Sequence, residues 1–130
     1  MRRISSDYDH ERYDPAAPVV EIGVAKSGSA DPAIRLTALV DSGADATMLP
    51  IDVLQTAGGR YITTRKMRGV AGRPIAVEMY LVKLFIGPLT FLGIEAVAMT
   101  PNSDAILGRD VLNQMIVTLN GLANVVELSQ

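Results

Sequence analysis

Short apolar runs separated by turn-forming residues make up most of the chain from Val19 onward. The runs are rich in Val, Ile, Leu and Thr and end at Gly, Pro, Asn or Asp, which is typical of an all-β domain. A turn at Asn120 and Gly121 should join the last two runs into a hairpin, because Asn-Gly favours tight turns. The expected strands cover residues 19–25, 34–40, 61–67, 74–85, 90–99, 116–119 and 123–128.

Two segments outside these runs favour short helices, over residues 51–56 and 109–114. Asp110 near the start of the second helix suits the positive end of a helix dipole. Residues 1–18 differ from the rest because they are polar and charged and contain two prolines, which is typical of a flexible arm. We therefore expect an N-terminal arm over residues 1–18 and one folded domain over residues 19–130.

The composition narrows the possible chemistry. Among 130 residues there is no cysteine and a single histidine, His10. A cysteine nucleophile or a thiolate metal site is therefore excluded, and one chain cannot supply a multi-histidine metal site. A Ser-His-Asp triad would depend on His10 in the polar arm and is disfavoured. The net charge of −2 argues against a broadly basic surface, so we expect no nucleic-acid partner.

Membrane segments and targeting signals are not expected either. Met1 and two arginines are followed by polar residues rather than by the apolar stretch of a signal peptide. The longest apolar region, residues 77–99, is interrupted by charged side chains and by a Gly-Pro pair, so it does not resemble a membrane span. The sequence predicts a soluble, cytoplasmic protein without a membrane partner.

Three glycine-containing segments carry the candidate chemistry. In residues 39–47, Asp41 directly follows an apolar strand, where a carboxylate is costly to bury unless it is paired or in use. Residues 68–73 form a glycine-bearing apex between two strands and suit a mobile flap. Residues 105–110 lead from an apolar pair through a glycine into the second helix. Each segment alone has an ordinary structural explanation, since an Asp-Ser-Gly tripeptide is most often only a turn.

Together, in this order and in an all-β chain, the three segments resemble the retropepsin-like aspartic proteases, the retroviral protease family and its cellular relatives. The resemblance spans residues 19–120 and rests on residues 38–45 and 106–112. It implies a closed β-barrel with one flap hairpin and a short helix after the Ile-Leu-Gly motif. The C-terminal hairpin extends beyond the retroviral pattern. It resembles the protease domain of ubiquitin-shuttle proteins of the DNA-damage-inducible type, whose dimers are built on such hairpins.

The resemblance also implies a role for each motif residue. Asp41 matches the catalytic aspartate, Ser42 the hydroxyl residue that stiffens the active-site loops, and Gly43 the glycine that keeps the floor of the cleft open. Arg109 matches an arginine that pairs with the position of Asp45 and braces the dimer. The residues implied to line the substrate subsites are Leu39, Ala44, Asp45, Met48, Gly69, Val70 and Ile106.

Aspartic proteolysis needs two close carboxylates that share one proton. Because the chain has one Asp-Ser-Gly, the second Asp41 should come from another copy across a two-fold axis. The sequence thus predicts a homodimeric aspartic endopeptidase that cleaves polypeptides and needs neither a metal nor a cofactor. Two alternatives stay open: a non-catalytic dimeric peptide-binding module with the same fold and, more remotely, a glycosidase. The C-terminal hairpin should hold the dimer, unless it only closes its own barrel.

Overall fold

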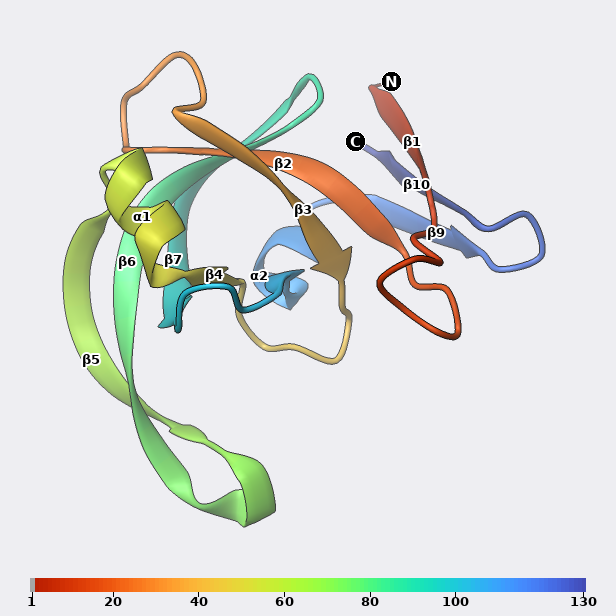
Figure 1. Cartoon of the computed structure of the whole chain (residues 1–130). Helices are drawn as coiled ribbons and strands as arrows, with labels where there is room; N and C mark the ends of the chain where they lie inside the picture. The colour runs from red at the N-terminus through yellow and green to blue at the C-terminus, as the bar shows by residue number, and fades with distance from the viewer. Residues whose placement is uncertain (1) are drawn as a thin grey trace.

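Six strands wind into a closed barrel, which the computed structural model describes over residues 2–130 (Figure 1). The strands follow one another in the order β2-β3-β8-β4-β7-β6, and β6 pairs back onto β2, which closes the ring. The all-β, barrel-forming fold expected from the sequence is confirmed. The barrel strands are β2 (Val19–Ala25), β3 (Ile34–Val40), β4 (Met48–Pro50), β6 (Pro74–Ile86), β7 (Leu89–Met99) and β8 (Ala105–Leu107).

The barrel interior is filled by aliphatic side chains and one aromatic ring. Ile22, Leu49, Leu84 and Leu107 are fully buried, and Phe91 is almost so. In β3 and β8 only alternate residues enter this core, because successive side chains of a strand point to opposite faces. The residues between them therefore lie on the outer face of the barrel.

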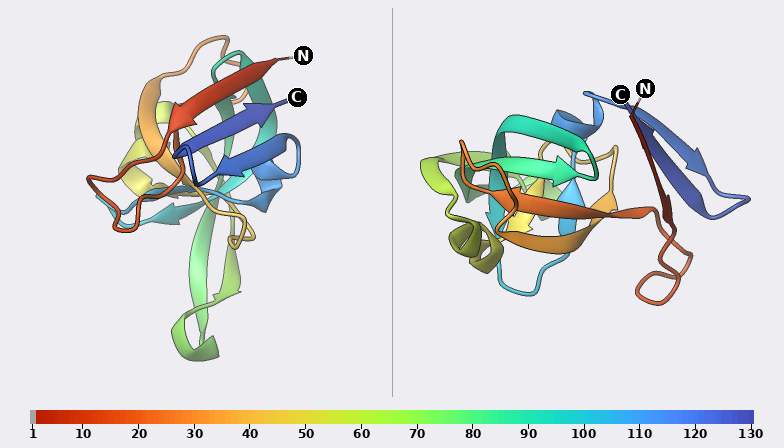
Figure 2. Two further views of the ribbon diagram at one scale, coloured as in Figure 1. Left: turned by 90° about the vertical axis from the view of Figure 1, so that its right-hand side faces the viewer. Right: turned by 90° about the horizontal axis from the view of Figure 1, so that it is seen from above.

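A long hairpin extends from the barrel and occupies the place expected for a flap. Strand β5 (Arg60–Arg68) pairs with the first half of β6, and the short 3-10 turn η1 (Val70–Gly72) forms the tip. The amide of Gly69 donates a hydrogen bond of 2.7 Å to the carbonyl of Arg73 and closes the turn. Figures 1 and 2 show this hairpin, coloured green, projecting away from the body of the molecule.

The two chain ends form a separate sheet on the other side of the barrel (Figure 2). Its order is β1-β10-β9, with β1 (Arg3–Asp7), β10 (Val125–Ser129) and β9 (Ile116–Asn120) all antiparallel. The expectation of a flexible arm without a strand before Val19 is therefore wrong for residues 3–7. The polar sequence of β1 does not show the apolar alternation by which a strand is recognised. The strand forms because the edge of β10 supplies backbone hydrogen-bond partners along the whole length of β1.

The C-terminal hairpin forms as expected, but its turn differs. Asn120 pairs with Val125, so four residues make the loop instead of the two-residue Asn-Gly turn. The side chain of Asn120 accepts a hydrogen bond of 3.0 Å from the amide of Ala123, which stabilises the wider loop. Val126 and Leu128 are buried in the chain's own core. The hairpin thus closes its own subunit, whatever further role its outer edge has.

Both helices form where they were expected, as α1 (Ile51–Ala57) and α2 (Arg109–Leu112), the second two residues shorter. The three-residue strands β4 and β8 were not foreseen, because strands this short leave no recognisable period in the sequence. Neither helix within residues 2–130 could span a lipid bilayer.

Candidate active site

A row of apolar side chains, which we call the floor row, crosses the outer face of three neighbouring strands. Leu39 pairs in register with Ile106, and Ile106 pairs with Met48. All three are half-buried, and their strand neighbours point into the barrel core instead. The row continues through Val97 to Met79 at the base of the β5–β6 hairpin. The structure thus brings three of the expected subsite residues together.

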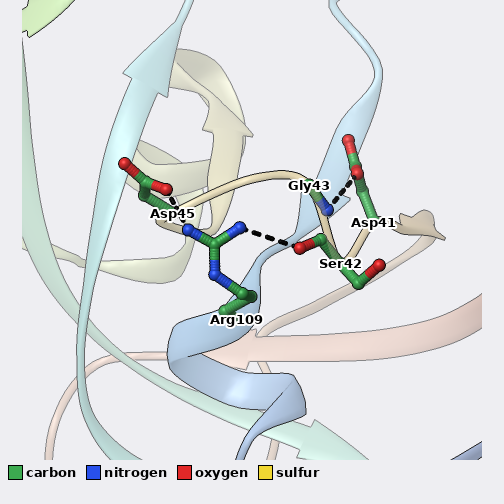
Figure 3. A network of polar contacts seen from close by, with 5 residues as sticks. All are labelled: Asp41, Ser42, Gly43, Asp45 and Arg109. Carbon is green, nitrogen blue, oxygen red and sulfur yellow. Dashed lines mark hydrogen bonds and ion pairs between the residues drawn. The ribbon is translucent and has the colours of Figure 1, made fainter.

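Asp41 lies at the end of β3 beside the floor row. Its amide donates a hydrogen bond of 3.1 Å to the carbonyl of Leu107, which extends the β3–β8 ladder by one residue. By the alternation of the strand, Asp41 shares the outer face with Leu39. Its Oδ1 accepts a hydrogen bond of 2.8 Å from the amide of Gly43 (Figure 3). A Cβ on Gly43 would lie 3.1 Å from this oxygen, so glycine leaves the carboxylate room.

Arg109 ties the two ends of the Asp41 loop (residues 41–47) together. Its Nη1 donates a hydrogen bond of 2.8 Å to the carbonyl of Ser42, and its Nη2 pairs with the carboxylate of Asp45 (Figure 3). Ser42, Gly43 and Asp45 are exposed. An exposed ion pair contributes little to stability, so the effect of Arg109 is to fix the shape of the loop.

A buried hydroxyl, which the sequence analysis did not single out, anchors the other side of the loop. Thr47 is fully buried, and its Oγ1 donates a hydrogen bond of 2.8 Å to Asp110 and accepts one of 3.2 Å from the amide of Gly108. The amide of Arg109 donates to the carbonyl of Ala44 at 2.9 Å. A polar residue between Ala46 and Met48, directly before a strand, was the signal that could have revealed this anchor.

Replacing Thr47 by valine keeps its shape and removes both hydrogen bonds. We expect Thr47→Val to lower the free energy of unfolding by about 2 kcal/mol, because Asp110 and the amide of Gly108 lose a buried partner. Denaturant unfolding measures the loss. The matched control is Thr90→Val on the exposed side of β7, which should change stability by less than about 0.5 kcal/mol. Equal losses of unfolding free energy in Thr47→Val and Thr90→Val would contradict the anchoring role of Thr47.

Gly108 allows the two loops to approach each other closely. A Cβ at this position would lie 2.5 Å and 2.6 Å from the backbone carbon and oxygen of Ala46. Gly108→Ala must therefore displace the backbone of the Asp41 loop, and we expect a loss of about 3 kcal/mol in unfolding free energy. Gly121→Ala is the control, since its Cβ would meet no atom of the described chain within 4 Å. A well-folded, fully stable Gly108→Ala protein would refute this close contact.

Two pockets flank the Asp41 loop. One, of about 330 Å³, lies between the loop and the base of the β5–β6 hairpin and is lined by Asp45, Ala46, Arg65 and Met79 among others. The second, of about 290 Å³, is lined by Ser42 and by apolar residues of the segment from α2 to β9. Within residues 2–130, no three acidic or histidine side chains gather as a metal site would require.

The remaining expected subsite residues lie in different places. Ala44 is half-buried inside the Asp41 loop. Gly69 borders the tip of the β5–β6 hairpin, which projects away from the barrel (Figure 1). Val70 contributes its backbone to the tip, while its side chain falls outside what the structure describes.

Comparison with known proteins agrees with this arrangement. A family model described as aspartyl protease matches residues 28–111, which include the Asp41 loop, the β5–β6 hairpin and the start of α2. A sequence search of curated proteins found no match.

Solved structures resemble the chain over nearly its whole length. A retropepsin-like aspartic protease from Rickettsia conorii is 14% identical, with a TM-score of 0.66, and the match covers 98% of this chain and 90% of that one. EIAV protease complexed with the inhibitor HBY-793 is 20% identical, with a TM-score of 0.59, and the match covers 84% and 93% of the two chains. These likenesses confirm the retropepsin-like fold. Because the family model spans well over half of the sequence, the chain belongs to the aspartyl protease family.

Proposed function

We propose that this protein is a homodimeric aspartic endopeptidase in which Asp41 from each of two copies activates one water molecule. Family membership supports protease-type chemistry. The observation that carries the proposal is the placement of Asp41, which stands at the end of an apolar floor and is held by the amide of Gly43. With one Asp-Ser-Gly per chain, a carboxylate pair requires a second copy.

The reaction follows from a pair of carboxylates sharing one proton. Two like charges a few ångströms apart cannot both be ionised, so one Asp41 is a base and the other an acid. The base takes a proton from water as the water oxygen attacks the scissile carbonyl carbon, and the acid protonates the carbonyl oxygen. In the second step a proton passes to the amide nitrogen and the C–N bond breaks. The other carboxylate takes a proton from the diol, so the pair again holds one proton.

The proposed contact between copies runs from the Asp41 loop to the edge of β9. Ser42 and Gly43 are exposed in the single chain, as residues next to a two-fold axis would be. The pocket beside Ser42 is also lined by Val117 and Leu119 of β9. Ile116 and Leu119 expose 61% and 53% of their surface, and β9 pairs with only β10 within the described chain. Apolar, unpaired strand edges favour association.

Extended polypeptides fit this site best. A peptide strand lying over the floor row would place alternate side chains on Leu39, Ile106 and Met48, while its backbone bonds to the loop and to the β5–β6 hairpin. The test is cleavage of denatured casein by the purified protein, with Asp41 replaced in the control. Binding of peptides without any cleavage would favour the alternative of a non-catalytic dimeric peptide-binding module.

A further inference from the structure

The segment joining β1 to β2, residues 8–18, is an ordered loop that lies against the end of β3. We call it the N-terminal loop. Asp9 and Ala17 exchange backbone hydrogen bonds of 2.8 Å and 3.1 Å at its base. Its last residue, Pro18, accepts a hydrogen bond of 2.9 Å from the amide of Val40, directly before Asp41. The loop is therefore attached to the strand that carries the candidate catalytic residue.

Asp9 fixes the shape of the loop and the position of Arg12. Its Oδ1 accepts hydrogen bonds of 3.1 Å from the amide of Arg12 and 2.9 Å from that of Glu11. The bond from the Arg12 amide is the main reason why the pKa of Asp9 is lowered, so the carboxylate that makes the turn stays ionised. The direction in which Arg12 leaves the loop is thus set by local bonds.

Arg12 contacts the carboxylate of Asp104, and Tyr13 follows Arg12 in the N-terminal loop. Arg12 Nη2 lies 2.7 Å from Asp104 Oδ1, and the two residues are 92 positions apart. Burial first, and then the negative charge of the nearby Asp104 carboxylate, raises the pKa of Tyr13. The N-terminal loop is therefore tied through Arg12 to the segment that precedes β8.

Asp104 is next to the floor row. It stands two residues before Ile106, so the alternation of the strand puts both on the outer face, where Ile106 pairs with Leu39. The ion pair of Arg12 with Asp104 is consequently two residues along the chain from the floor row, toward the face that carries Asp41. The β5–β6 hairpin borders the same row at its other end, beyond Met48.

We infer that the N-terminal loop is a wall of the substrate site and that Arg12, held by Asp104, limits together with Tyr13 the size of the subsite over Leu39 and Ile106. The inference rests on the proposed function. The subsite has an apolar floor and a wall of two large side chains, so it takes an aliphatic side chain and discriminates against a bulkier aromatic one. The wall belongs to the same chain as the floor that it borders.

Cleavage of a peptide library by the full-length protein tests the wall. For one position of the substrate peptide, Arg12→Ala should raise the ratio of the cleavage rate with an aromatic residue to that with an aliphatic residue about tenfold. This is the range of discrimination that a pocket wall supplies. Arg12→Lys keeps the ion pair and should restore the original preference. The control is Arg35→Ala, which removes an exposed ion pair of 3.6 Å with Glu21. It lies six residues before Asp41 on β3, about 20 Å along the strand.

Asp104 provides a coupling test. Asp104→Ala keeps the Arg12 side chain but removes the carboxylate that holds it in position, so it should change the preference as Arg12→Ala does. The double variant should change it no further, because both substitutions break one contact. The denaturant midpoints of Arg12→Ala, Asp104→Ala and the double variant should equal the midpoint of Arg35→Ala. If Arg12→Ala and Asp104→Ala left the preference for aliphatic over aromatic residues unchanged, the inference would be overturned. An equal change of this preference at every substrate position would overturn it as well.

Peptide binding to the Asp41→Asn protein separates this inference from the proposed function. Two peptides that differ only by leucine or phenylalanine at the selected position are titrated with Asp41→Asn, with and without Arg12→Ala. A tenfold shift in their affinity ratio supports the wall even if the unmodified protein cleaves nothing. No shift refutes the wall even if casein cleavage is robust.

Discussion

Asp41→Asn is expected to abolish peptide-bond cleavage while the fold and the dimer stay intact. Asparagine has the shape of aspartate, and its Oδ1 can still accept the hydrogen bond that Asp41 takes from the amide of Gly43. It cannot take a proton from water at neutral or acidic pH. Loss of the base and of the shared proton should reduce kcat by about 10⁴-fold, the upper range of general acid–base catalysis.

The measurement compares casein cleavage by the original protein, Asp41→Asn and Asp31→Asn at equal concentrations. Asp31 is an exposed loop carboxylate before β3, and its replacement should leave activity unchanged. Denaturant unfolding checks that the three proteins are equally stable. A purified Asp41→Ala protein with full activity would exclude the aspartic protease mechanism.

Activity per chain is expected to fall on dilution, because a shared site exists only in the dimer. A charge placed on the exposed edge of β9 should likewise lower the activity per chain, at a fixed protein concentration. Leu119→Glu puts a carboxylate beside Ser42 in the proposed interface. We expect the dissociation constant of the dimer to rise about a hundredfold, since central apolar contacts carry most of the binding energy.

Sedimentation of Leu119→Glu measures the association constant, and cleavage assays over the same concentrations relate it to activity. Ile62→Glu is the control, because Ile62 exposes 37% of its surface on β5, outside the proposed interface and outside both pockets. A monomeric protein with full activity at every concentration would contradict the shared site.

Deleting the C-terminal hairpin would not answer this question. The deletion of residues 121–130 removes β10, the middle strand of the terminal sheet. It also removes Val126 and Leu128, which are 0% and 1% exposed and belong to the core. Because such a loss unfolds a small domain, only a surface substitution distinguishes the interface from the fold.

The candidate site was predicted in part from the sequence. Asp41, Ser42 and Gly43 form a contiguous motif after an apolar strand, and Arg109 follows a second motif. The order of these motifs in an all-β chain, through its resemblance to a known family, was sufficient to select them. The structure joins Arg109 to Ser42 and Asp45. Thr47 was missed because its partner, Asp110, is 63 positions away and only the packed loop brings the two together.

Strands with long apolar runs between helix- and strand-breaking residues could be predicted from local sequence alone. Strands β2 and β3 begin and end at the expected residues, because Pro18 precedes one and Asp41 with Gly43 follows the other. Local conformational preference and hydrophobic period contain this information without any distant contact.

Other elements form only because a partner distant in the sequence packs against them. β1 is polar and gains its hydrogen bonds from β10, more than a hundred residues later. β4 and β8 are too short to be stable alone and are held between longer strands. The contact of Arg12 with Asp104 depends on how the N-terminal loop folds over the end of β3. Such features follow from register and packing over long sequence separations, which no local pattern encodes.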